Sequence, residues 1–274
     1  MGMQINTNLA ANNTYRNLNA TQNDLSKSLE KLSSGLRINR AADDAAGLAI
    51  SEGLRSQVGG LTVAARNAQD GISVVQTAEG GLTEVHSILQ RVRDLAVQSG
   101  NDSNNADART AIQTEVTALG DELTRIGNST NFNGIDLLNS TGSLTFQVGA
   151  GSTAANDQIS VQLTDITAVA TAVGALTFGS SADALTSIAA IDTQIKNVSS
   201  ARSELGAVQN RFEHSIASTN VAKENLTAAN SRIRDVDMAE EMVKYTRSNV
   251  LSQAGQAMLA QANQSTQGVL SLLR

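Results

Sequence analysis

The sequence predicts a mainly α-helical fold: a long coiled-coil helical rod built from both halves of the chain, with a small β-hairpin region. Three observations lead to this class. The 274 residues include no proline, which removes a helical hydrogen bond and clashes with the preceding turn. Apolar residues recur at alternating spacings of three and four over most of the chain, as in a coiled-coil seam. Between residues 144 and 163 this spacing gives way to strict alternation of apolar and polar residues, which is typical of strands.

The segment from Ile5 to Ser34 is expected to form an amphipathic helix. One stripe repeats every seven residues and a second accompanies it: Ala11, Leu18, Leu25 and Leu32, then Tyr15, Leu29 and Leu36. Gly35 follows where a helix commonly ends in a left-handed residue. Residues 35–60 hold several further glycines and are interpreted as a connector with short helical pieces, one of them capped by Asp43 or Asp44.

The central part of the chain should contain helices and one hairpin. The helical spacing is strongest over 61–98, and a polar loop at 99–107 leads to a second helix that is expected to pack antiparallel to it. Residues 144–148 and 159–163 are the predicted strands, joined by a turn region. The following stretch, 164–182, is rich in alanine, threonine, glycine and serine and should hold either one more strand or a flexible tip.

Helical spacing returns near Ala184 and continues to the end of the chain, with an expected bend near 230–237. The two ends share an unusual composition, since Arg16 is the only charged residue in 1–23 and none occurs in 248–273. A lone surface helix normally carries charges on its wet face. The ends therefore suit helices enclosed by neighbouring chains; the alternative, disorder in the free monomer, is compatible with ordering on assembly.

Composition and motifs exclude several classes of function. The formal charge of −6 and a pI near 5.0 disfavour nucleic-acid binding, which needs cations to replace counterions. No run of 18 apolar residues predicts a membrane span, no cleavable leader is expected, and no cysteine is present. His86 and His214 have no partner ligands at metal-site spacing, and Asp43 and Asp44 suit capping better than acid/base chemistry. We expect no catalytic residues, no metal and no cofactor.

Several motifs, in matching order and separation, resemble bacterial flagellin, the subunit of the flagellar filament. They are MQINTNLAA (3–11), LSKSLEKLSSGLRINRAADDAAGLAIS (25–51), RNAQDGISVVQTAEGGL (66–82), LQRVRDLAVQ (89–98), FNGIDLL (132–138), FQVGA (146–150) and RIRDVDMAEEMVKYTRSNVLSQAGQAMLAQANQSTQGVLSLL (232–273). The middle of the chain is too short for the outer variable domains of longer relatives, so the resemblance implies a minimal subunit.

The resemblance implies a nested organisation with four segments. These are an N-terminal inner helix and connector (1–42), an N-terminal part of the rod with the β-hairpin (43–180), a C-terminal part of the rod (181–234) and a C-terminal inner helix (235–274). The side chains expected to pack in the filament core are Leu18, Leu25, Leu29, Leu32, Leu251, Met258, Val269 and Leu272.

The resemblance also implies partners and a location. The chain would form a homopolymer outside the cell, after passage through the flagellar type III export apparatus without a cleaved signal peptide. It would meet the filament cap and the hook-filament junction proteins. A flagellin export chaperone would bind the C-terminal helix, although the apolar stripe there equally suits pairing with the N-terminal helix.

Recognition by Toll-like receptor 5 is implied at Gln90, Arg91, Leu95 and Glu115. From the residues alone, Leu95 could equally be a packing contact of the rod, and Arg91 and Glu115 a solvated or subunit-bridging pair. Two other functions stay open at this point: a hook-filament junction protein, and a secreted coiled-coil adhesin with its ligand site in 140–185.

Overall fold

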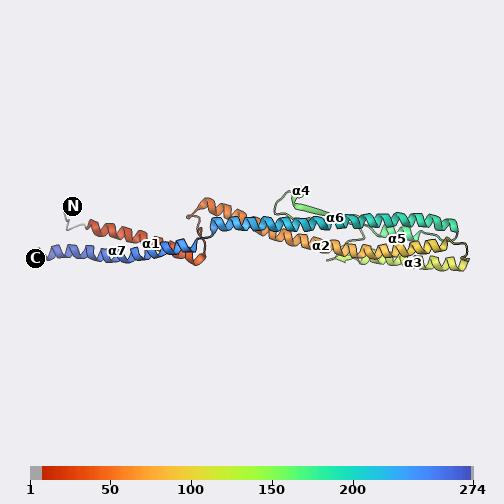
Figure 1. The fold of residues 1–274 in the computed structure, drawn as a ribbon, viewed down its shortest axis with the longest axis horizontal. Coiled ribbons are helices and arrows are strands. Elements are labelled where there is room, and N and C mark those ends of the chain that lie inside the picture. Colours follow the sequence, from red (N-terminus) through yellow and green to blue (C-terminus); the bar gives the residue numbers. More distant parts are fainter. Residues whose placement is uncertain (1–7, 273–274) are drawn as a thin grey trace. The chain divides into compact units, whose positions relative to one another are not determined.

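The computed structural model describes the backbone of residues 8–272 and the side chains of residues 8–264. The predicted helix start at Ile5 and the side chains of Val269 and Leu272 lie outside these described residues. The elements in chain order are α1 (Leu9–Ser34), α2 (Ala45–Ser99), α3 (Ala106–Ser129), β1 (Asn131–Phe132), β2 (Ile135–Asp136), β3 (Ser143–Gln147), α4 (Ala154–Asp157), β4 (Gln158–Gln162), α5 (Thr167–Gly174), α6 (Ser181–Arg234) and α7 (Met238–Leu272) (Figure 1). This is the mainly helical fold with a small hairpin region that the sequence predicts.

The chain divides into two compact units. The terminal unit comprises the residues up to 56 and from 225 onward, and the central unit comprises 57–224. Long helices α2 and α6 each contribute to both units.

In the terminal unit α1 and α7 lie side by side (Figure 1). The Asn8 side chain caps α1 by accepting a hydrogen bond from the Ala11 amide at 3.0 Å, and it donates one to the Ala262 carbonyl of α7, also at 3.0 Å. Gly35 ends α1 with φ of 72°, which confirms the left-handed cap predicted there. The C-terminal helix is therefore paired with the N-terminal helix within one chain.

Two short connectors meet beyond these helices. Leu36 and Asp235 form an isolated antiparallel bridge. The Arg37 amide donates to the Arg234 carbonyl at 2.6 Å, and the Val236 amide donates to the Gly35 carbonyl at 3.0 Å. The break between α6 and α7 at 235–237 confirms the predicted bend.

The prediction of an irregular connector over 35–60 is only half right. Residues 35–44 are irregular, but α2 begins at Ala45 and continues without interruption to Ser99. Asp44 starts the helix as predicted, because its carboxylate accepts a hydrogen bond from the Gly47 amide at 2.8 Å. Each helical glycine costs about 1 kcal/mol relative to alanine, so packing along both units outweighs local propensity here.

The core of the central unit follows the predicted helical stripes. The members of the α2 stripe are all buried: Val75, Ala78, Leu82, Val85, Leu89, Val92 and Ala96. Arg91 lies eight residues before the end of α2 and pairs with Glu115, nine residues after the start of α3. This correspondence confirms the predicted antiparallel packing of the two helices.

The predicted hairpin is present, shifted by one residue. In the antiparallel pair β3–β4, Leu144 stands opposite Val161 and Phe146 opposite Ile159, so the apolar partners share one face. The pair β1–β2 was not expected from the alternation of residues, since each strand has only two residues. Its turn, Asn133–Gly134, has positive φ at both positions, as a tight hairpin requires.

The prediction of a strand or flexible tip over 164–182 is wrong. Residues Thr167–Gly174 form α5, which buries Val169, Ala170 and Val173 against α3. The branched side chains of Thr and Val lower helix propensity, and for this reason the sequence did not predict a helix in this segment. None of the described helices combines the length and the hydropathy that crossing a membrane would require.

Candidate functional site

The terminal unit joins α1 to α7 through a seam in which leucines alternate with small and polar residues. On both helices, enclosed positions recur at spacings of three and four. They are Ala11, Thr14, Leu18, Thr21, Leu25, Ser28 and Leu32 on α1, and Glu241, Tyr245, Ser248, Ser252, Gly255, Leu259 and Ala262 on α7. The stripe containing Leu18, Leu25 and Leu32 therefore lies where the sequence placed it. The prediction for the companion stripe is wrong for two of its three residues: Tyr15 and Leu29 are exposed, and hydroxyl residues occupy the corresponding seam positions. Leu36 is half-buried and lies beyond the end of α1, where it bridges Asp235.

Other large apolar side chains of this unit lie outside the seam and are exposed. We call nine of them the outer apolar surface, and each is between 48% and 64% exposed in the described chain: Leu9, Tyr15, Leu29, Met238, Met242, Val243, Val250, Leu251 and Met258. All nine belong to the same pair of helices, and large exposed apolar patches on a soluble protein mark interaction sites. Leu29, Leu251 and Met258, predicted to pack in a filament, thus lie on this surface.

The outer apolar surface has few charges around it over much of its length. Arg16 is the only charged residue between 10 and 22, and none occurs between 249 and 264. The exposed positions in these spans are mostly Asn, Gln, Ser, Thr and Ala. Enclosing such faces between other protein chains costs little, because no ion has to leave water.

Charged residues concentrate in the C-terminal part of α1 and in the first turns of α7, where they line a hollow of about 360 Å³. The sequence did not predict this hollow. We call it the basic groove. It is lined by Asp24, Lys27, Ser28, Lys31, Glu241, Lys244, Arg247, Ser248 and Leu251. Its cations occur four residues apart on α1 and three apart on α7, a spacing that places each pair on one helix face and could have revealed the groove.

Carboxylates of α7 pair with only one of these cations. Lys244 Nζ lies 2.8 Å from Glu240 Oε1 and 3.8 Å from Glu241 Oε2. The hydrogen bond to Glu240 raises the pKa of Lys244. Within the described residues, no carboxylate lies within 4 Å of the charged atoms of Lys27, Lys31 or Arg247.

A second group of predicted site residues lies in the central unit. Arg91 donates to one carboxylate oxygen of Glu115 through Nη2 at 2.7 Å and through Nε at 2.9 Å, and both side chains are about half exposed. Gln90, also exposed, contacts His86 Nε2 at 3.0 Å. Leu95 is only 2% exposed, so it packs in the core beneath this surface. The structure brings Arg91 and Glu115 together but does not present Leu95 on the surface.

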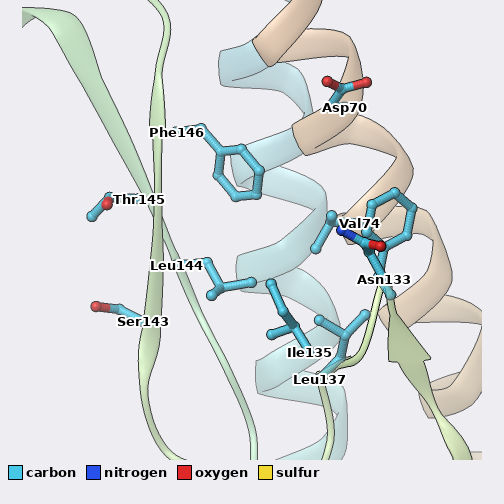
Figure 2. A pocket seen from close by; sticks show the side chains of 10 residues that line it. Asp70, Val74, Asn133, Ile135, Leu137, Ser143, Leu144, Thr145 and Phe146 are labelled. Atoms are coloured by element: carbon cyan, nitrogen blue, oxygen red, sulfur yellow. The ribbon is translucent and has the colours of Figure 1, made fainter.

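The remaining hollow of note is a cavity of about 370 Å³ in the central unit. Val74 and Asp70 of α2 line one side, and the β1–β2 hairpin and β3 line the others (Figure 2). Leu144 and Phe146 point toward the helices, whereas Ser143 and Thr145 point away. Its lining is mainly apolar, and Asp70 is its only charged group, so it offers no pair of convergent groups for acid/base chemistry.

Asp43, which was weighed as a catalytic group, instead stabilises the connector. Its Oδ2 accepts hydrogen bonds from the amides of Arg40 at 3.0 Å and Asn39 at 3.2 Å. These bonds lower the pKa of Asp43, and the nearby Lys31 and Lys27 lower it further. Among the residues whose positions are described, no three His, Asp or Glu side chains are placed to hold a metal ion.

Comparison with known protein families gives two matches. Residues 5–143 match the profile of the bacterial flagellin N-terminal helical region. Residues 188–273 match that of the bacterial flagellin C-terminal helical region. Together the matches leave out residues 1–4, 144–187 and 274, and the middle stretch holds most of β3, all of α4, β4 and α5, and the start of α6.

Relatives that align over nearly the whole chain point to the same family as these two matches. The chain is 54% identical over 275 aligned positions to a flagellin of Halalkalibacterium halodurans, covering 99% of this chain and 100% of the relative. It is 49% identical to a flagellin of Bacillus subtilis with the same coverage. The crystal structure of Bacillus cereus flagellin superposes with a TM-score of 0.50 and 32% identity, covering 56% of this chain and 88% of that one.

Proposed function

Because this chain belongs to the bacterial flagellin family, and is therefore a structural subunit of the flagellar filament, we propose that it polymerises by burying its outer apolar surface between neighbouring copies. The observation that carries the proposal is the arrangement of the terminal unit. Its seam combines four leucines with small and hydroxyl residues, while nine further large apolar side chains stay exposed outside the seam. Such a helix pair is incomplete as a monomer.

Burial of this surface supplies the driving force for association. Removing apolar area from water contributes about 25 cal/mol per Å², and ordering the helices opposes it at roughly 1–2 kcal/mol per residue of backbone entropy. Growth is therefore favoured at a filament end, where one helix pair meets several partners at once. The faces of α1 and α7 differ from one another, and contacts between non-identical surfaces build open helical polymers.

Elongation of preformed filament seeds tests the proposal. Val250→Gln and Met258→Gln each remove an apolar group from the outer apolar surface, outside the basic groove, and should leave the circular dichroism of the monomer unchanged. A loss of about 1–2 kcal/mol per contact predicts a critical concentration raised roughly 5- to 30-fold. The matched control is Leu185→Gln, at an exposed leucine of α6 in the central unit.

The control should elongate seeds like the unsubstituted chain. Seed elongation by the two α7 variants at the unsubstituted critical concentration would refute the assignment. An equal defect in the control would refute it as well. The same assay separates the filament subunit from a hook-filament junction protein or an adhesin, which should not elongate seeds.

The outer apolar surface also bears on the steps before assembly, because free subunits must not associate through it. An export chaperone that covers the Met and Val side chains of α7 would keep free subunits apart, in a helix-in-groove contact. α1 and the chaperone would then bind α7 at different times. We also assign to this proposal export through the flagellar type III apparatus without a cleaved leader, an extracellular location in the filament, and contacts with the cap and hook-filament junction proteins.

Recognition by Toll-like receptor 5 is a second proposed role, favoured by the exposure of Gln90, Arg91 and Glu115 on neighbouring helices. The ion pair holds the Arg91 guanidinium in place while part of it stays accessible for forked hydrogen bonds. Leu95 supports this surface from below rather than touching a receptor directly.

A receptor reporter assay tests this role with a matched pair of variants. Arg91→Ala should reduce activation at least 10-fold. Arg125→Ala, which breaks the equally exposed Arg125–Glu122 pair on α3, should not change activation. Undiminished activation by Arg91→Ala would remove the assignment.

A further inference from the structure

The basic groove of the terminal unit stands apart from the outer apolar surface in its chemistry. Cations from two helices converge on it: Lys27 and Lys31 from α1, and Lys244 and Arg247 from α7. The carboxylates in its lining are those of Asp24 and Glu241. The cations in the lining therefore outnumber the carboxylates, and the groove is positively charged overall.

Of these four cations, only Lys244 pairs with carboxylates of the same chain among the residues that the structure describes. Glu241 is buried and lies 3.8 Å from Lys244, while Glu240 binds the same lysine. Asp43 is influenced electrostatically by Lys31 and Lys27, but its bonded oxygen faces the amides of Asn39 and Arg40. Lys27, Lys31 and Arg247 are therefore available to an external anion.

The two units differ strongly in charge. The terminal unit has 11 Lys and Arg against 9 Asp and Glu, a formal charge of +2. The central unit has 9 against 17, a formal charge of −8. Within the fully described span 57–224, only five of those 17 carboxylates form an ion pair: Glu79, Asp102, Glu115, Glu122 and Asp192.

We propose that the basic groove of one copy binds carboxylates of the central unit of a second copy. This inference rests on the proposed function, because the contact forms when subunits assemble. It deepens that function by giving it a polar contact with a defined register. The outer apolar surface supplies adhesion but little positional selectivity, whereas complementary charges fix register and speed encounter. A second terminal unit is a poorer occupant, because its net charge has the same sign as the groove.

Carbodiimide cross-linking of filaments mixed from ¹⁴N- and ¹⁵N-labelled subunits tests the contact. This reagent joins a lysine amine to a carboxylate only when the two groups touch. We expect peptides that link Lys27 or Lys31 of one isotope to an Asp or Glu within 57–224 of the other. Links from Lys244 to Glu240 should join like isotopes only, which provides an internal standard.

A charge-reversal pair provides the functional arm. Lys27→Glu with Lys31→Glu should raise the critical concentration at least 10-fold at low salt. The control, Arg55→Glu with Arg232→Glu, makes the same change of charge at exposed sites of the terminal unit outside the groove and should stay within about 2-fold. A Lys27→Ala and Lys31→Ala variant, checked for helicity, covers the case in which the glutamates perturb the fold.

The outcomes separate this contact from polymerisation itself. Failure of the unsubstituted chain to elongate seeds would count against the proposed function. Normal elongation with groove lysines linked only to their own copy, or to terminal units, would overturn the groove contact alone. Equal defects in the groove and control variants would also overturn it.

Discussion

The ring of Phe212 on α6 lies directly over Gly71 on α2, so closely that a Cβ atom on Gly71 would come within 2.7 Å of the ring Cζ. Phe146 of β3 meets the same ring edge-to-face, with 5.5 Å between centroids and 90° between planes. The Phe212 ring is therefore held between Gly71 and Phe146, and a larger residue at position 71 would have no space.

Gly71→Ala should therefore destabilise the central unit, even though alanine is the better helix former. Overpacking costs about 1–3 kcal/mol, which exceeds the gain of up to about 1 kcal/mol in helix propensity. Thermal unfolding followed by circular dichroism should show a lower midpoint. Gly206→Ala on α6, where no atom lies within 4 Å of the added Cβ, should raise the midpoint instead.

The left-handed end of α1 gives a second prediction. Gly35 has φ of 72° and open space around it, so the strain of a side chain there is conformational and not a clash. Gly35→Ala should lower the free energy of unfolding by about 1–2 kcal/mol, and Gly35→Asn by clearly less, because Asn tolerates this region. Urea unfolding of the three chains measures the order. Equal losses for Ala and Asn would contradict the conformational explanation.

The connector predicts a dependence on pH. Folding lowers the pKa of Asp43 below its ordinary value of 3.8, mainly through the Arg40 and Asn39 amides. The stabilisation is thus complete above that ordinary value and is lost as pH falls through the lower pKa of the folded chain. Thermal midpoints of the unsubstituted chain and Asp43→Asn should differ at pH 6, and the gap should narrow progressively as the pH falls below about 4. A gap that stays constant down to pH 2.5 would exclude this origin.

The methionines predict a sensitivity to oxidation. All three in the described part of the chain, Met238, Met242 and Met258, lie on the outer apolar surface and are about half exposed or more. Peroxide transfers an oxygen atom to the thioether and leaves as water, which turns an apolar side chain into a polar sulfoxide. Treated monomers should keep their helicity but elongate seeds at a several-fold higher critical concentration.

A variant with leucine at all three positions serves as the control for oxidation. It should elongate seeds equally well before and after peroxide. Intact filaments exposed to the same dose should form sulfoxide at 238, 242 and 258 more slowly than monomers do, as mass spectrometry can measure. Equal rates in both states would mean that assembly does not enclose these side chains.

Long-range periodicity was the part of the fold that sequence could predict. Helical stripes such as Val85, Leu89 and Val92 extend over many turns, so single exceptions do not obscure them. Local signals were less dependable. The glycines before 60 lie inside α2, and the Val- and Thr-rich α5 is held as a helix by burial against α3. In both places tertiary packing outweighs local helix propensity. A short window of sequence carries no information about that packing, so neither of these helical stretches could be predicted locally.

Part of the candidate site could likewise be predicted from the sequence and part could not. Leu18, Leu25 and Leu32 were correctly placed in the seam, because a seven-residue repeat defines a single face. That Tyr15 and Leu29 face outward could not be predicted, since a stripe does not say which of two faces meets the partner helix. The convergence of Lys27 and Lys31 with Lys244 and Arg247 depends on α1 and α7 being side by side, although more than 200 residues separate them along the chain.

The bridge between Leu36 and Asp235 joins residues made at opposite ends of translation. A ribosome adding about 5–20 residues per second needs at least roughly 10 s to reach Asp235 after Leu36. Throughout that interval α1 has neither its connector partner nor α7. The order of synthesis thus holds back completion of the terminal unit until nearly the whole polypeptide exists, which leaves a period in which the nascent chain cannot yet nucleate growth.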